Sequence, residues 1–292
     1  MQTQVFHLHT LTALHVGTGQ GVGVVDLPIA RSKATHLPLV PGSALKGVLR
    51  DELAVQKSLS QADVNTLFGP DTTDGDSFSG AIAFSDANLL ILPIRSFAGT
   101  VAYATCPFIL KRYARDLNVN LPILTLEGEE AAVTTNSVLE VKSGALALED
   151  LDINSESTDS INDWAELIAS QIYPNDVLNA DRWQAEFVKR FVVLPDDIFS
   201  FLVDTATEIR TRIRIDRATR IVKEGALWTE ENLPAEAVLW GVLGVNKSFD
   251  KNNKRSPEEL AALLPTEEMT IQIGGKHTVG RGICRLLLTA QK

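Results

Sequence analysis

Apolar residues follow two different periods along this chain, and the period changes several times. Residues 3–16, 81–95 and 238–245 carry them in alternation or in short runs, which predicts β-strands. Residues 43–55 and 106–118 place them three and four positions apart, which predicts helices. Two further strands are expected at 269–273 and 283–289. The pattern therefore indicates a chain that mixes strands and helices.

The first predicted helix follows Pro41-Gly42, and Ser43 is expected to be its N-cap. Lys46 and Arg50 are four residues apart, so they share one face near the helix start. Free N–H groups and the helix dipole attract phosphate at such a start, although a solvated charged face gives the same pattern. The expected buried stripe consists of Leu45, Val48, Leu49, Leu53 and Val55.

Residues 121–204 are rich in acids, and between Glu127 and Glu166 the only basic residue is Lys142. Helices are expected at 161–172, 181–191 and 196–205. We interpret 121–204 as an acidic, largely helical insertion within a single domain that spans residues 1–292.

In the next stretch, isoleucines alternate with arginines, with Thr211 in one of the isoleucine positions. Its members are Ile209, Arg210, Arg212, Ile213, Arg214 and Ile215. This two-residue period predicts a strand; a polar turn at 216–219 and a second strand at 220–228 complete a hairpin within residues 205–232. One face of the hairpin would be rich in arginine. A solvated outer face of a sheet is the alternative interpretation.

Glycine occupies every second position from 17 to 23, at Gly17, Gly19, Gly21 and Gly23, and a single acid follows at Asp26. Glycine lets a backbone lie close to a ligand, so this run indicates a binding loop, with a flexible surface loop as the alternative. The run leads into an extended segment and Pro28 rather than a helix, which excludes a dinucleotide fingerprint. His15 adjoins the loop and could reach a phosphate, or could be a hydrogen-bonded histidine at a strand end.

A second glycine-rich stretch, residues 274–282, lies between the last two predicted strands. It combines Lys276 and Arg281 with four glycines, which include Gly280 and Gly282. Backbone amides and positive charge can both reach a phosphate chain from such a loop. The stretch therefore indicates contact with a nucleic-acid backbone.

Composition narrows the class of protein further. The chain has 292 residues, 45% of them hydrophobic, and a net charge of −10. Its basic residues gather in separate patches, which suits a specific channel better than general polyanion binding. No apolar run reaches the roughly 18 residues of a membrane span, and Cys106 and Cys284 form no CxxC motif. A cytoplasmic protein without disulfides, a zinc site or a membrane partner is expected.

In combination and order, these stretches resemble the RAMP superfamily of CRISPR effector proteins, and among them the backbone subunit of type III-B (Cmr) complexes. The resemblance covers the whole chain. It is carried by VVDLPI at 24–29, PGSALKGVLRDELA at 41–54, FGP at 68–70, ATCPF at 104–108, TRIRIDRATRIVKEGALWTEENLP at 211–234 and GGKHTVGRG at 274–282.

The resemblance implies an α+β fold with a ferredoxin-like (RRM-like) palm, the helical insertion and the hairpin as a projecting thumb. It implies copies stacked head to tail, other Cmr subunits, a guide RNA and a complementary target RNA cleaved at regular intervals. Guide contacts come from phosphates, while base pairing supplies sequence recognition. The expected RNA-binding residues are Gly17, Gly19, Gly21, Ser43, Lys46, Arg50, Arg210, Arg212, Arg214, Lys276, Gly280, Arg281 and Gly282.

The same resemblance assigns target cleavage to Asp26, and His15, Glu230 and Glu231 are considered as catalytic helpers. The expected reaction is attack of a 2′-OH on the adjacent phosphate. Asp26 would act as a base or as the ligand of a Mg²⁺ ion, and assistance by Mg²⁺ is the favoured expectation. Two alternatives stay open: a non-catalytic RNA-binding scaffold, and a guide-processing endoribonuclease of the same superfamily.

Overall fold

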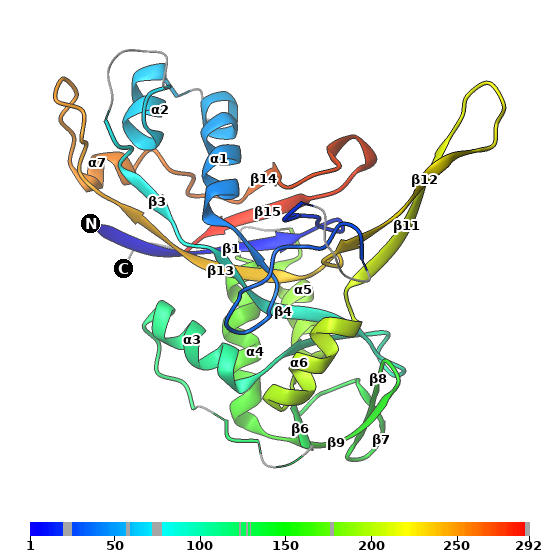
Figure 1. The fold of residues 1–292 in the computed structure, drawn as a ribbon. Coiled ribbons are helices and arrows are strands. Elements are labelled where there is room, and N and C mark those ends of the chain that lie inside the picture. Colours follow the sequence, from blue (N-terminus) through cyan, green and yellow to red (C-terminus); the bar gives the residue numbers. More distant parts are fainter. Residues whose placement is uncertain are drawn as a thin grey trace.

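The computed structural model describes residues 1–19, 25–56, 59–71, 78–122, 124–126, 128, 130–175 and 178–289. A large, mostly antiparallel sheet runs through the molecule, with helices on both of its sides and a hairpin that projects from one end (Figure 1). The α+β class is thereby confirmed. No helix of these residues combines the length and the apolar character needed to cross a membrane.

Four antiparallel strands form the centre of the sheet, in the order β15-β1-β13-β4. They are β1 (Gln2–Thr10), β4 (Ala87–Arg95), β13 (Val238–Val245) and β15 (Ile283–Leu288). Their residues are buried in near-continuous runs because helices and loops cover both faces, so the apolar pattern alternates only loosely. The predicted strand 81–95 is divided into β3 (Ile82–Phe84) and β4 by Ser85, whose hydroxyl accepts the amide of Val242 at 2.8 Å.

Helix α1 (Gly42–Gln56) covers one face of these strands and packs on α2 (Gln61–Phe68). It begins at Gly42, so Ser43 lies inside the first turn and the predicted N-cap is wrong. The amide of Gly42 is instead capped from a distance, by the Asp86 carboxylate at 2.9 Å. The predicted stripe is buried at Leu45, Leu49 and Leu53, but Val55 is 77% exposed because the last turn extends beyond the core.

Residues 121–204 extend the sheet and cover its other face. The three helices found here are close to the predicted ones, but the described residues also form five strands, so the segment holds more sheet than expected. Strand β10 pairs in parallel with β5 and joins β6 to the sheet. The elements are β6 (Glu130–Val133), β7 (Glu140–Lys142), β8 (Ala145–Leu148), β9 (Leu151–Ser157), α4 (Asp159–Ile172), α5 (Ala180–Val188), β10 (Phe191–Val193) and α6 (Asp196–Thr205). That these residues are an insertion stays a prediction.

The shorter elements complete the molecule. They are β2 (Leu39–Val40), β5 (Val101–Thr105), α3 (Pro107–Leu117), α7 (Pro257–Ala261) and β14 (Met269–Gln272). Helix α3 lies where the apolar spacing of 106–118 predicts it, with Tyr113 fully buried and Lys111 exposed.

The predicted hairpin is present as a separate two-stranded sheet of β11 (Glu208–Ile215) and β12 (Val222–Asn232). It extends beyond the large sheet (Figure 1), and most of its side chains are exposed. The Asp216 carboxylate accepts the amides of Ala218 and Thr219 and thereby closes the turn. Among the described residues the hairpin joins the rest of the molecule at its root, where His15 and the glycine-rich loop 274–282 also lie.

Candidate RNA-processing site

The loop that carries Asp26 pairs with the root of the hairpin. The amide of Leu27 donates to the carbonyl of Thr229 at 3.1 Å, and the amide of Glu231 donates to the carbonyl of Leu27 at 3.0 Å. These bonds add the loop to the free edge of β12 as a short parallel neighbour. The root of the hairpin therefore helps to determine the position of Asp26.

Asp26 is held by one residue of β12. Its Oδ2 accepts the Thr229 amide at 2.7 Å and the Thr229 hydroxyl at 2.9 Å, while the hydroxyl accepts the Asp26 amide at 3.1 Å. The backbone bond from Thr229, followed by its hydroxyl, lowers the pKa of Asp26 below its ordinary value. The side chain is exposed, and among the described residues no hydrogen bond reaches Oδ1. The site therefore presents an ionised carboxylate with one open oxygen.

His15 stabilises the same root of the hairpin through its contact with β12. Its Nδ1 lies 2.7 Å from the Glu231 carbonyl, and because a carbonyl only accepts, Nδ1 carries the proton. Its own carbonyl accepts the amide of Gly275, which connects the second glycine-rich loop. A Cβ at Gly17 would lie 2.9 Å from His15 Nε2, so only glycine fits there. His15 is buried and joins three segments that are distant in the sequence.

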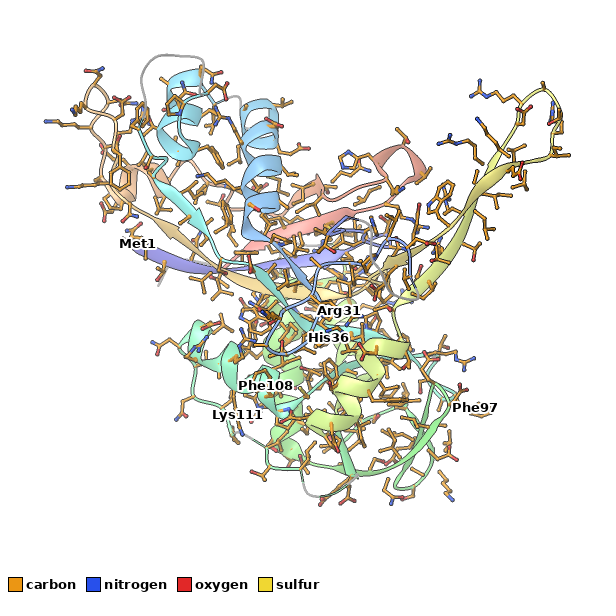
Figure 2. The ribbon with its side chains drawn as sticks, in the orientation of Figure 1. Met1, Arg31, His36, Phe97, Phe108 and Lys111 are labelled. Carbon is orange, nitrogen blue, oxygen red and sulfur yellow. The ribbon has the colours of Figure 1, made fainter. Side chains whose placement is uncertain are left out.

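Glu231 fixes the segment that follows Asp26 with both of its oxygens. One oxygen accepts Arg31 at 2.6 Å and the Thr207 hydroxyl at 3.0 Å, and the other accepts the amide of Ile29 at 3.0 Å. Arg31 also contacts Asp204 of α6 at 3.1 Å, and Figure 2 shows it on the loop beside that helix. Glu231 is therefore a buried anchor of the site and is not free to act in catalysis.

Cations gather on the other face of the hairpin root. The register pairs Arg210 with Glu230 and Arg212 with Trp228, so these four side chains share one face. Lys276 reaches the same face, with its Nζ 2.9 Å from Glu230 and 5.8 Å from the Trp228 ring centre. This contact joins the second glycine-rich loop to the arginine-rich face that the sequence predicts.

Arg281 and Glu230 are buried at this face with spare hydrogen-bonding capacity. Arg281 is 6% exposed and its Nε has no partner among the described residues. Burial, and then the neighbouring Arg210, lowers the pKa of Arg281, but guanidinium stays charged in proteins. Burial opposes the ionisation of Glu230, yet bonds from Trp228 and Lys276 outweigh it and lower its pKa. An unpaired buried donor beside several cations favours an incoming anion.

Acid and cations thus flank one strand. Neighbouring residues of a strand point to opposite faces, so Thr229 directs Asp26 to one side while Glu230 gathers Lys276 to the other. This arrangement can bind phosphates along one face and present a carboxylate on the other.

The other residues that were predicted to bind RNA differ in whether they are exposed or engaged by neighbouring groups. Lys46 is half-buried on α1 with no ion pair among the described residues, whereas Arg50 binds the Gly69 carbonyl at 2.8 Å and Asp71 at 3.0 Å. The structure therefore does not present this pair as two free cations. The amide of Gly282 donates to the Ala13 carbonyl. Ser43, Gly17, Gly19, Arg214 and Gly280 are exposed, and Gly21 lies outside the described residues.

Two residues determine the geometry, Thr229 and Glu231: sequence reasoning missed Thr229, and it considered Glu231 only as a catalytic helper rather than as an anchor. Nothing in the local pattern distinguishes Thr229, and its contact with Asp26 spans 203 positions.

No group of three or more metal-binding side chains occurs in the part of the chain that the structure describes. Asp26 is therefore the open carboxylate of the site, since Glu230 and Glu231 are engaged by their neighbours.

The chain is similar in sequence to a known family and to curated proteins over almost its whole length. The family model of the RAMP superfamily matches residues 7–285. A curated relative from Pyrococcus furiosus, the CRISPR system Cmr endoribonuclease Cmr4, is 33% identical, with 99% of this chain and 96% of the relative covered. The CRISPR system CMR subunit Cmr4 of Saccharolobus solfataricus is 24% identical, with 96% and 94% covered.

Solved structures of related proteins have the same fold over nearly the whole chain. The crystal structure of oligomeric Cmr4 from Pyrococcus furiosus superposes with a TM-score of 0.73 at 26% identity, covering 99% of this chain and 98% of the other. A chain of the cryo-EM structure of the type III-B Cmr-beta complex bound to cognate target RNA shares the fold, with a TM-score of 0.75 at 22% identity and coverage of 99% and 97%. The chain belongs to the RAMP superfamily and, within it, to the Cmr4 family.

Proposed function

We propose that the chain is the guide-RNA-binding backbone subunit of a type III-B CRISPR interference complex, and that it cleaves complementary target RNA. Its full-length relative from Pyrococcus furiosus carries the name of an endoribonuclease, and a solved relative is oligomeric. Copies of this chain would stack head to tail along one guide RNA in the cytoplasm, together with other Cmr subunits. The observation that carries the proposal is the Asp26 carboxylate, held open by Thr229 at the root of an arginine-rich hairpin.

The guide would follow the cationic face. Lys276, Arg281, Arg210 and Arg212 lie together there, and Lys46 on α1 would be a separate contact. Phosphate contacts hold RNA in register without reading its sequence. Each such contact contributes about 0.7 to the slope of log affinity against log salt for a single strand.

We also propose a ferredoxin-like palm and a thumb role for the hairpin. Support for the palm comes from the order β15-β1-β13-β4 with α1 after β1 and α7 before β15, which is a βαββαβ arrangement. The thumb role is supported by a hairpin that leaves the palm at the Asp26 loop and exposes Ile209, Ile213 and Leu227. Such a projection can separate stacked bases and turn the adjacent phosphate into line.

The chemistry assigned to Asp26 follows from its lowered pKa. A strongly ionised carboxylate is a poor proton acceptor, so its role is to orient the attacking 2′-OH by accepting a hydrogen bond at Oδ1. The 2′-oxygen bonds to phosphorus, the bond to the 5′-oxygen breaks, and solvent removes and returns the protons. The products are a cyclic phosphate and a 5′-OH end. In-line geometry from the thumb supplies the remaining acceleration.

A Mg²⁺ ion fits this donor set only in a limited way. Magnesium binds through one or two carboxylates and completes its shell with water and phosphate, and Asp26 Oδ1 offers one such ligand. When bound, the ion would neutralise charge on the phosphate. The chelator EDTA should then abolish cleavage, and Mg²⁺ should restore it. Cleavage that persists in EDTA rejects the metal and leaves the orienting carboxylate.

His15 is proposed to act by bracing rather than by proton transfer. Its Nδ1 is committed to Glu231 and its carbonyl to Gly275, so the ring fixes the strand against both loops. Nε2 faces Gly17 and is the ring nitrogen that is not engaged by Glu231.

The test is the variant Asp26→Asn in the assembled complex. It keeps the shape and the Thr229 contacts but removes the charge, so guide and target should bind normally while the target stays whole. Cuts at unchanged positions would remove Asp26 from the catalytic assignment. If wild-type particles with Mg²⁺ leave the target intact, the scaffold alternative holds. If the isolated chain cuts a repeat hairpin, it is a guide-processing enzyme.

A further inference from the structure

A second basic site lies at the end of the sheet opposite the hairpin. Residues 246–256 connect β13 to α7, and Figure 1 shows this loop beside α2, on the same side of the sheet as the hairpin tip. Its residues enclose a hollow of about 480 Å³. Neither the catalytic loop nor the glycine-rich loop 274–282 contributes to the lining.

The loop is held in one shape by its own bonds and by α2. Ser248 donates its amide to the Arg255 carbonyl at 3.0 Å, which closes the loop at its neck. Asn253 reaches the Thr66 hydroxyl at 3.0 Å, and Arg255 pairs with Asp63 at 2.7 Å, so two side chains fasten the loop to α2. A site arranged in advance loses little entropy when it binds a ligand.

Its charge is opposite to that of the molecule. The hollow is lined by Lys247, Lys251, Lys254 and Arg255 against one acid, Asp250, in a chain with a net charge of −10. The three lysines are exposed and make no ion pair among the described residues, whereas Arg255 is used by Asp63. Three uncompensated ammonium groups around one hollow attract a polyanion.

An aromatic ring lies among these cations. Phe249 lines the same hollow and is 46% exposed, with no ring or cation stacked on it within the described part of the chain. An exposed aromatic platform between lysines is the combination by which proteins bind single-stranded nucleic acid, with bases on the ring and phosphates on the cations. We propose that residues 247–256 form a second site for single-stranded RNA, separate from the track at the hairpin root.

An acidic protein partner is less well suited to the site. Such a partner would pair with the lysines but would leave the phenylalanine ring exposed inside a polar hollow. RNA uses both features, and the volume accommodates a nucleotide-sized group. RNA that leaves the hairpin across α1 would arrive at this loop because the hairpin tip, α1 and the loop lie on the same side of the sheet (Figure 1).

Two variants of the full chain test the site, with a fluorescently labelled oligouridine as the probe. Lys247→Gln/Lys251→Gln/Lys254→Gln should flatten the salt slope by about 2, since three contacts are lost. Phe249→Ala should weaken binding by roughly tenfold without changing the slope, because a stacked base is lost and no charge is removed. The control Lys33→Gln/Lys111→Gln/Lys142→Gln removes the same net charge from exposed positions elsewhere and should leave the slope unchanged.

Photocrosslinking from 4-thiouridine identifies the strand. In assembled particles the thiouridine is placed in the guide in one arm and in the target in the other, and a crosslink to residues 247–256 from either strand supports the site. Equal slopes for the loop variant and the control, or crosslinks confined to other segments, would overturn it. Loss of another subunit from the particle with unchanged RNA affinity would show a protein-binding surface instead. Asp26→Asn should retain full RNA affinity, whereas the loop variants should retain the Asp26 carboxylate, so this proposal and the cleavage proposal can fail separately.

Discussion

Thr229→Val isolates the hydroxyl that positions Asp26. Three hydrogen bonds connect the two residues; two of them use the hydroxyl and one uses the Thr229 amide. Valine has nearly the same shape and keeps the amide, so the loop stays attached while the carboxylate gains freedom to rotate. A displacement of 1 Å at a reacting group costs about a hundredfold in rate. With one anchor left, we expect target cleavage to slow by about tenfold.

The pH dependence separates positioning from ionisation. The hydroxyl is the second cause of the lowered pKa of Asp26, so valine raises that pKa toward its ordinary value of about 3.9. The carboxylate is ionised above its pKa, so both proteins carry the charge at neutral pH. The tenfold loss should therefore stay constant between about pH 6 and pH 8. Only in acid should the variant lose activity at a higher pH than the wild type.

The matched control is Thr211→Val, which makes the same change directly across the strand pair from Thr229, at an exposed side chain with no bond to Asp26. Single-turnover cleavage of a labelled target by assembled particles measures both variants. Wild-type rates for Thr229→Val, or an equal loss for Thr211→Val, would refute the positioning role of the hydroxyl.

Two further substitutions test how the root is built. Gly280 and Gly282 both have positive φ, but a Cβ at Gly282 would lie 1.9 Å from the Ile273 carbonyl while none crowds Gly280. Gly280→Ala should lower the free energy of unfolding, measured with denaturant, by about 1 kcal/mol. Gly282→Ala should lower it by roughly 1–3 kcal/mol more because of the close contact. Equal losses for the two variants would contradict the packing argument. Glu231→Gln leaves one of the three donors to Glu231 without an acceptor and should lower the free energy of unfolding by about 3 kcal/mol. The control Glu224→Gln changes an exposed side chain and should leave the stability unchanged. Unchanged stability of Glu231→Gln would contradict its anchoring role.

Regular alternation made the hairpin the easiest element to predict. Arginine occupies every second position from Arg210 to Arg214, between Ile209, Thr211, Ile213 and Ile215, so both the period and the faces can be derived from the sequence. Helix α3 was predicted to within a residue at each end because its apolar spacing is equally regular. Four of the five strands of residues 121–204 have only three or four residues, which is too short for an alternation to identify them.

The site was only partly predictable because its contacts are distant in the sequence. The glycine run and Asp26 indicated a binding loop, but the partner of Asp26 is a threonine without any local signal. Arg50 shows the converse. Its spacing from Lys46 predicts a shared phosphate contact, yet the turn after α2 provides a carbonyl and a carboxylate that engage it. Periodicity indicates which face a side chain occupies but not which group will meet it there.

The central claim is that Asp26 lies beside a scissile phosphate that the hairpin has turned into line. Its most direct test is the distance from Asp26 Oδ1 to the attacking 2′-oxygen in a structure of the assembled particle with an uncleaved target RNA. The account predicts hydrogen-bond contact, about 3 Å, at a nucleotide displaced by the hairpin. The account would be contradicted if the Asp26 carboxylate lay at least one nucleotide away from every displaced position of the target RNA.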